Sequence, residues 1–258
     1  MSTGSHDAIV NGQFGPQARS YLTSPVHSSG EDLDRMSELA AACGKDATAL
    51  DVGCGGGHAS YRLAPLVAKV VAYDLSEAML AVVAEEARGR GLANVAVVQG
   101  AAESLPFPDA SFDLAVTRYS AHHWADVRRG LAEMRRVVRP DGRGIFMDAI
   151  APVSPLLDTW FQSLELLRDP SHVRDYSLQE WQSMLVDAGF RVVQSMHFRI
   201  RLDFAAWIAR MRTPASHVEA IRSLQRRADA GVTEYFGFEE DGSFAIETAL
   251  VVAEAGQK

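Results

Sequence analysis

Residues 49–57 read ALDVGCGGG, and this stretch decides the fold. An apolar segment runs directly into a glycine-rich turn and then into a helix that begins near His58, as in a βα unit whose turn faces a ligand. Glycines at positions 53, 55 and 57 let the backbone approach a bound molecule without a Cβ in the way. Nicotinamide dehydrogenases, and some turns that bind nothing, carry similar loops. The dehydrogenase fingerprint, however, requires Gly or Ala where His58 stands and has no acid at the position of Asp51, so this loop disfavours a nicotinamide site.

Short apolar runs alternate with amphipathic helices from Met36 onward. The runs predict strands over 49–52, 70–73, 95–98, 114–119 and 144–148, and later over 191–198 and 245–253. Ser76 and Asp126 are suited to cap two of the intervening helices, with Arg135 on the solvent side of the second, and residues 140–142 predict a turn. This alternation is typical of parallel βαβ units.

Composition narrows the class of protein. The 258 residues carry a formal net charge of −8, which weighs against nucleic acid as a partner because phosphate binding normally requires a basic face. Two cysteines cannot form a disulfide framework, and the N-terminus does not resemble a signal peptide. No apolar run approaches the ~20 residues of a membrane helix. We therefore expect a cytoplasmic protein without a membrane span, as a monomer or homodimer.

Asp74 is a second signal, because it directly follows the apolar run at 70–73. A carboxylate at the end of the second strand can accept hydrogen bonds from both ribose hydroxyls of a nucleoside that lies across the strand ends. The alternative is an aspartate that caps a helix or lies on the surface. After the third predicted strand, residues 100–107 place small residues and then Glu103 and Leu105 where an adenine ring could be sandwiched.

Four ordered motifs complete this pattern: LDVGCGGG at 50–57, VVAYDLSEAML at 70–80, VQGAAESLPFPDASFDLAV at 98–116 and LAEMRRVVRPDGRG at 131–144. Together they resemble the class I methyltransferases that use S-adenosylmethionine (SAM), and in particular the ubiquinone and menaquinone biosynthesis group with its type 11 domain. The resemblance implies an α/β fold with a Rossmann-like, doubly wound, seven-stranded and mostly parallel sheet, an antiparallel last strand and helical insertions that form a lid.

The resemblance also divides the chain. Residues 1–35 are rich in Gly, Ser and Pro and have no core of their own, so we expect an N-terminal lid segment. Residues 36–258 would form the methyltransferase domain, with a cofactor-binding core at 36–150. The helical patterns at 151–190 and 201–235 would be insertions on the acceptor side.

Cofactor roles follow from the same resemblance. The methionine part of SAM would lie near residues of the glycine turn, the ribose would bind Asp74, and the adenine would contact residues after the second and third strands. Arg118, which ends the fourth strand, could touch SAM or the acceptor, and Tyr21 could close over SAM, although a packed aromatic is as good an interpretation. The expected cofactor residues are Asp51, Gly53, Cys54, Gly55, Asp74, Leu75, Met79, Ala102, Glu103, Arg118 and Tyr21.

The methyl group of SAM is already electrophilic, so the protein must mainly align an acceptor and exclude water. His122 and His123 follow the fourth strand, at the edge where α/β proteins bind ligands, and we expect one of them, His123 in preference to His122, to face the acceptor as a general base. Histidines that merely pack in the loop are the alternative. We expect Tyr119, His172, Arg174 and Tyr176 to bind the acceptor, against a structural loop for the last three.

The paired histidines have no further Cys, Asp or Glu at ligand spacing, so we expect no metal site. The function expected is methyl transfer to a small organic acceptor at an O, N or C atom. A nicotinamide-dependent oxidoreductase and a non-catalytic SAM-binding module are the alternatives.

Overall fold

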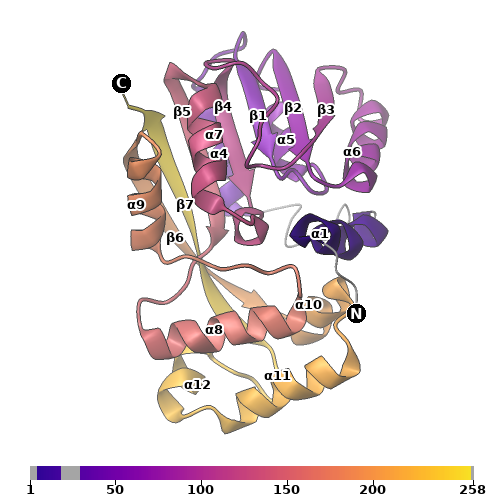
Figure 1. Ribbon diagram of the computed structural model, residues 1–258, viewed down its shortest axis with the longest axis vertical. Coiled ribbons are helices and arrows are strands. Elements are labelled where there is room, and N and C mark those ends of the chain that lie inside the picture. Colours follow the sequence, from indigo (N-terminus) through magenta and orange to yellow (C-terminus); the bar gives the residue numbers. More distant parts are fainter. Residues whose placement is uncertain (1–4, 19–29, 257–258) are drawn as a thin grey trace.

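A seven-stranded sheet forms the centre of the computed structural model, which describes residues 5–18 and 30–256 (Figure 1). The strand order is β3-β2-β1-β4-β5-β7-β6. Strands β1 to β5 pair in parallel, whereas β7 is antiparallel to both β5 and β6. This confirms the predicted Rossmann-like, mostly parallel sheet with an antiparallel last strand. The strands span Thr48–Val52 (β1), Lys69–Asp74 (β2), Val95–Gln99 (β3), Phe112–Arg118 (β4), Val138–Ala149 (β5), Phe190–Leu202 (β6) and Phe244–Ala255 (β7).

Helices cover both faces of the sheet because successive strand residues point to opposite sides. Leu50 packs in one cluster with Leu131 of α7 and Trp181 of α9. Ala49 packs in another with Met36 of α4 and with α5. Burying each large apolar side chain contributes about 1.5–3 kcal/mol. The helices on the sheet are α4 (Glu31–Ala41), α5 (His58–Leu63), α6 (Glu77–Gly89), α7 (Val127–Val137) and α9 (Leu178–Asp187).

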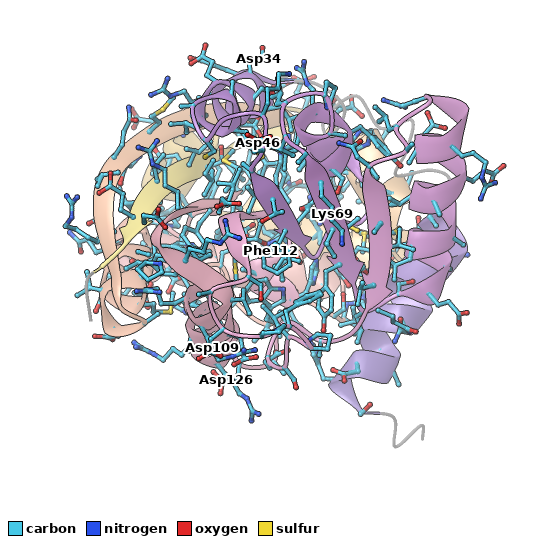
Figure 2. The ribbon with its side chains drawn as sticks, turned by 90° about the horizontal axis from the view of Figure 1, so that it is seen from above. Asp34, Asp46, Lys69, Asp109, Phe112 and Asp126 are labelled. Carbon is cyan, nitrogen blue, oxygen red and sulfur yellow. The ribbon has the colours of Figure 1, made fainter. Side chains whose placement is uncertain are left out.

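A second layer of helices lies beyond the carboxyl ends of the parallel strands (Figure 1). We call it the helical cap; it has its own apolar cluster, which includes Phe161, Trp207, Phe236 and Phe244. Its helices are α8 (Pro155–Arg168), α10 (Phe204–Met211), α11 (Ala215–Arg227) and α12 (Ala230–Phe236). Helix α12 begins after the capping residue Asp229, near the end of the helical pattern expected at 201–235. Figure 2 looks onto the opposite, amino edge of the sheet, where Lys69 and Phe112 begin β2 and β4.

The N-terminal helix α1 (His6–Phe14) lies between the sheet and the cap (Figure 1). It continues into a short turn of 3₁₀ helix, Gly15–Gln17. Gln13 Nε2 of α1 donates to the Met211 carbonyl of α10 at 2.8 Å. Farther along, α4 runs through residue 36, so the expected division of the chain falls inside a helix.

Two local predictions were wrong. Residues 140–142 do not separate a helix from a strand, because β5 already begins at Val138 and its pairing with β4 shifts register across these residues. Arg135 does not face water: it is buried and donates to the carbonyls of Gly189, Val138 and Gly256, which hold it inside. Within residues 5–18 and 30–256, no helix has both the length and the apolar character needed to cross a bilayer.

Candidate active site

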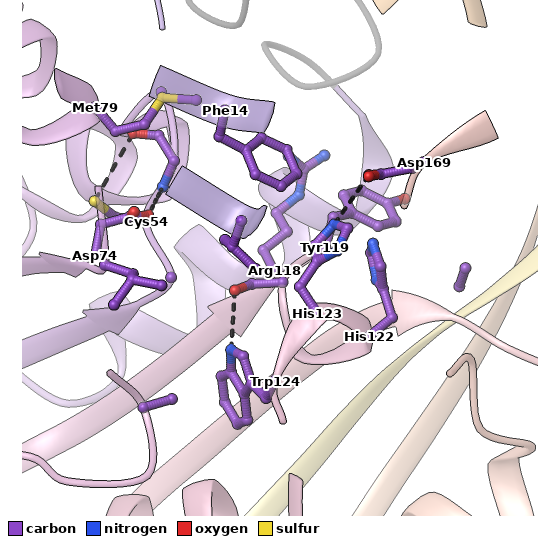
Figure 3. A pocket seen from close by; sticks show the side chains of 18 of the residues that line it. Phe14, Cys54, Asp74, Met79, Arg118, Tyr119, His122, His123, Trp124 and Asp169 are labelled. Atoms are coloured by element: carbon purple, nitrogen blue, oxygen red, sulfur yellow. Dashed lines mark hydrogen bonds and ion pairs between the residues drawn. The ribbon is translucent and has the colours of Figure 1, made fainter. Parts of the chain in front are cut away.

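One large cavity opens at the carboxyl edge of the sheet, where the parallel strands end beneath the helical cap (Figure 3). Its walls come from the glycine turn after β1, the end of β2, the loop after β3 and the end of β4. Helix α1 and the cap complete it. This is the edge at which α/β sheets bind ligands, because the loops that follow the strands diverge there.

The glycine turn needs residues without a Cβ. Gly53 has a φ of +69°, and a Cβ on it would overlap the Ser120 hydroxyl in the loop after β4. A Cβ on Gly57, whose φ is +81°, would meet the Tyr61 ring at 2.7 Å. The turn therefore brings its backbone against the cavity. Gly53, Cys54 and Gly55 all line it.

Asp51 connects β1 to the helix that follows the turn. Its Oδ2 accepts from Ser60 Oγ at 2.7 Å and from Ser60 N at 3.0 Å. Burial raises the pKa of Asp51 to about 6, although the hydrogen bonds from Ser60 oppose the shift. Asp51 lines the cavity and also fixes the start of α5.

Asp74 lies at the end of β2, facing the glycine turn (Figure 3). Its Oδ2 accepts from Gly55 N at 2.8 Å and its Oδ1 accepts from Ser76 N at 2.8 Å. Burial raises the pKa of Asp74, and these backbone hydrogen bonds partly offset the effect. Because each carboxylate oxygen can accept more than one hydrogen bond, the group can still bind donors from the cavity.

The remaining residues expected near adenine also line the cavity: Leu75, Met79, Ala102 and Glu103. Met79 lies in the first turn of α6, which Ser76 caps by accepting from Met79 N. Glu103 is held from behind, since its Oε1 accepts from Asp126 N at 3.1 Å. The structure thus brings four expected residues from two separate segments to one wall.

Arg118 and Tyr119 line the cavity at the end of β4. The Arg118 guanidinium forms a buried ion pair with Asp32 of α4 and lies 4.8 Å from the centre of the Tyr119 ring. Tyr119 has a φ of +52°, a left-handed conformation that costs a non-glycine residue about 1 kcal/mol or more. The chain therefore turns sharply between β4 and the two histidines.

His122 and His123 lie side by side on the cavity wall, with ring centroids 4.1 Å apart (Figure 3). His122 Nδ1 lies 2.6 Å from Asp148 Oδ1, at the end of β5. Burial lowers the pKa of His122, but the Asp148 and Asp175 carboxylates outweigh it and raise the pKa to about 9. The proton on Nδ1 is thus held by Asp148.

The pKa of His123 is shifted in the opposite direction to that of His122. Burial, followed by the charge of His122, holds its pKa well below the usual range. Its Nδ1 lies 3.1 Å from the Ser171 carbonyl, which can only accept, so Nδ1 carries the proton and Nε2 keeps a free lone pair. Nε2 lies 4.0 Å from Asp169 Oδ2. His6 Nε2 and the Phe14 ring, both from α1, contact the His123 carbonyl and ring.

Three expected acceptor residues do not line this cavity. His172 is buried behind His122, with Nε2 2.8 Å from Gln162 Oε1, and burial lowers its pKa to about 4. Arg174 pairs with Asp158 at 2.9 Å on the outside of the cap. Tyr176 lines a separate, shallow depression. Tyr21 lies outside the described residues.

Sequence reasoning missed the part of the wall that the cap supplies. Trp207, Met211, Asp169 and Asp175 all line the cavity. Both aspartates lie within the segment RDPSHVRDYS at 168–177, on either side of His172, and the close spacing of these titratable residues was a signal that could have drawn attention to them. The apolar residues read only as helix-core positions, since nothing local shows which face a cavity.

Comparisons with known proteins indicate the family of the chain. A family model described as a methyltransferase domain matches residues 50–146. The chain is 45% identical to the uncharacterized protein YafE of Escherichia coli over 76% of this chain and 95% of that protein. It is 39% identical to the uncharacterized methyltransferase YcgJ of Bacillus subtilis, over 81% of this chain and 82% of YcgJ. The crystal structure of YcgJ superposes with a TM-score of 0.83 at 35% identity, covering 88% and 99% of the two chains.

A further relative is the 2-phytyl-1,4-naphtoquinone methyltransferase of Synechococcus elongatus, 32% identical over 68% of this chain and 75% of that protein. These similarities favour a methyltransferase over the nicotinamide oxidoreductase alternative. The family model runs from β1 and the glycine turn into β5, and the YcgJ structure covers 88% of this chain. The chain therefore belongs to the SAM-dependent methyltransferases.

Proposed function

We propose that this chain transfers the methyl group of SAM to a small organic acceptor bound between the sheet edge and the helical cap. One observation carries the proposal: a single cavity joins Asp74 and the glycine turn to His123 and the cap residue Trp207. A methyl donor in the first half and an acceptor in the second would meet near His123. A site that only held a nucleoside would not need the second half.

In the cofactor half, we assign the ribose to Asp74, whose ionised carboxylate can accept from both hydroxyls. The methionine part would lie against the backbone of the glycine turn and Cys54. There the carboxylate of Asp51, once ionised, would offset the positive charges of SAM. Adenine would lie between Leu75, Met79 and the residues Ala102 and Glu103. Arg118, already paired with Asp32, would position Tyr119 rather than bind SAM directly.

Methyl transfer is an in-line displacement in this site. An electron pair of the acceptor attacks the methyl carbon while the carbon–sulfur bond breaks. The electrons of that bond remain on sulfur and neutralise the sulfonium, which gives S-adenosylhomocysteine. If the attacking atom carries a proton, His123 Nε2 is the group placed to accept it, because its lone pair is free. His122 is a poorer candidate, since Asp148 binds its Nδ1 proton.

An acceptor with an apolar body fits the cap side. Trp207, Met211, Ile200, Leu202 and Ile246 line this part of the cavity. The name of the Synechococcus relative, which indicates a naphthoquinone with a long apolar chain, is consistent with such a shape. We propose that residues 151–190 and 201–235 select the acceptor and that residues 1–35 act as a lid, in a cytoplasmic monomer or homodimer.

The test has two stages. Titration calorimetry with SAM and S-adenosylhomocysteine should show one site per chain, and absence of heat with both would end the proposal. Incubation with SAM labelled in its methyl group, against a panel that includes quinols, phenols and amines, should then transfer label to an acceptor. Tight binding with no transfer across the panel would favour the non-catalytic module.

A further inference from the structure

We propose that His122, Asp148 and Asp175 form a binding site for one divalent transition-metal ion, such as Zn²⁺ or Mn²⁺, at the acceptor end of the cavity. This reverses the expectation of no metal site. The three residues come from the loop after β4, the end of β5 and the loop after α8. They are far apart in the sequence, so no ligand spacing could reveal them.

The distances suit a metal ion. His122 Nδ1 lies 2.6 Å from Asp148 Oδ1 and 3.9 Å from Asp175 Oδ1, and one donor atom of each residue lies within 4.8 Å of the others. A triangle of this size has its centre about 2.4 Å or less from every corner, close to the 2.0–2.6 Å typical of metal–ligand bonds. One imidazole and two carboxylates are ligands that Zn²⁺ and Mn²⁺ both accept.

Asp175 gives an independent reason. It is 3% exposed, and its Oδ1 has no hydrogen-bond partner even though it points toward His122. A buried carboxylate oxygen without a donor or cation costs about 1–3 kcal/mol or more. His172 cannot supply the donor, because its Nε2 is bound to Gln162 and lies 3.9 Å from the other oxygen, Oδ2. A hydrogen bond between His122 and Asp148 alone leaves this oxygen unsatisfied, whereas an ion among the three residues satisfies it.

Charge balance supports the same assignment. Glu165, the other carboxylate near His122, is paired with Arg168 at 3.0 Å. In the ion-bound form both Asp148 and Asp175 would be deprotonated, and a divalent ion with a neutral His122 would balance their two negative charges. Asp148 is held in place because its Oδ1 also accepts from its neighbour Ala149 N at 2.9 Å.

The site would be open to substrate. His122 and Asp175 line the cavity, whereas Asp148 lies behind them. If the proposed methyl transfer holds, an acceptor oxygen could occupy a further coordination position beside His123. The ion would then hold that oxygen in line with the methyl group and favour its deprotonated form.

Calorimetric titration of the chelator-treated full chain with ZnCl₂, and separately with MnCl₂, tests the site. We expect one saturable site per chain for at least one of the two ions. Asp175→Asn and His122→Gln should each weaken binding by at least about tenfold, since each removes a ligand. Asp169→Asn is the matched control: it neutralises another buried aspartate of the same cavity outside the three ligands, and its affinity should stay within about threefold of wild type.

Absence of saturable binding to the wild type would overturn the proposal. So would an equal loss in Asp169→Asn and Asp175→Asn, which would indicate a general effect of charge. If Asp175→Asn does not fold, anomalous diffraction from zinc-soaked wild-type crystals decides, because the peak must lie among the three ligands. Binding of S-adenosylhomocysteine, measured on the same sample, separates the two proposals. If the chain binds S-adenosylhomocysteine but no metal ion, the metal site is wrong and the methyltransferase function still holds. If it binds the metal ion but not S-adenosylhomocysteine, the reverse is true.

Discussion

Replacing Asp74 by Asn should weaken cofactor binding by about tenfold to a hundredfold. The carboxylate uses one lone pair of each oxygen on Gly55 N and Ser76 N, both at 2.8 Å, and has capacity left for the two ribose hydroxyls. Asparagine keeps the shape but has one acceptor oxygen and no charge, so about one charge-assisted hydrogen bond is lost. Such a bond contributes about 1.5–3 kcal/mol, and each 1.4 kcal/mol is a factor of ten.

The assay is calorimetry with S-adenosylhomocysteine and with its 2′-deoxy analogue. Wild type should prefer the complete ribose, and Asp74→Asn should lose most of that preference because the acceptor for the missing hydroxyl has gone. Asp229→Asn is the matched control, since Asp229 also accepts from a backbone N–H, at the start of α12, but lies outside the cavity lining. Its cofactor affinity should not change.

Two results would refute the ribose assignment. One is unchanged affinity for S-adenosylhomocysteine in Asp74→Asn. The other is an equal preference for the complete ribose in wild type and variant. Thermal unfolding of both variants shows whether a loss of affinity merely reflects a loss of folded protein.

Four other substitutions and one exchange test the rest of the site. His123→Ala should lower turnover by about 10²- to 10⁴-fold and spare cofactor affinity if its Nε2 accepts the proton, and equal turnover would contradict that role. Gly53→Ala should lower the free energy of unfolding in urea by about 2 kcal/mol or more, because the new Cβ would overlap a serine hydroxyl. The Cβ of Gly55→Ala meets open space, so this variant should lose only about 1 kcal/mol, from the left-handed backbone conformation. The pKa of Asp51 is raised to about 6, so the stability that its neutral form contributes is complete below pH 3.8 and is lost as pH rises through 6. Relative to Asp51→Asn, the unfolding free energy of the wild type should therefore fall by up to about 3 kcal/mol between pH 4 and 7. Parallel curves of unfolding free energy against pH for the two proteins would contradict the shift. Exchanging residues 151–235 with those of a relative should change which acceptors receive labelled methyl, and an unchanged preference would remove their role in selection.

The sequence alone determined the sheet and the part of the cavity wall formed by the glycine turn and Asp74, because both depend on short-range patterns. An apolar run followed by a glycine turn predicts a strand, a turn and a helix wherever it occurs, and Asp74 follows its strand directly. Helix caps are equally local: Ser76 and Asp126 each accept the backbone hydrogen bond that their positions predicted.

Only the tertiary structure decided which residues line the cavity beneath the helical cap. His122, Asp148 and Asp175 meet because three loops converge at one sheet edge, and no periodicity relates residues on separate loops. The sequence predicted that Arg135 faces solvent, whereas in the structure it is buried, with hydrogen bonds to the carbonyls of Gly189 and Gly256, which are distant in the chain. Residues of the helical cap are apolar whether they fill a core or line a cavity, so the sequence could predict their burial but not the space that they enclose.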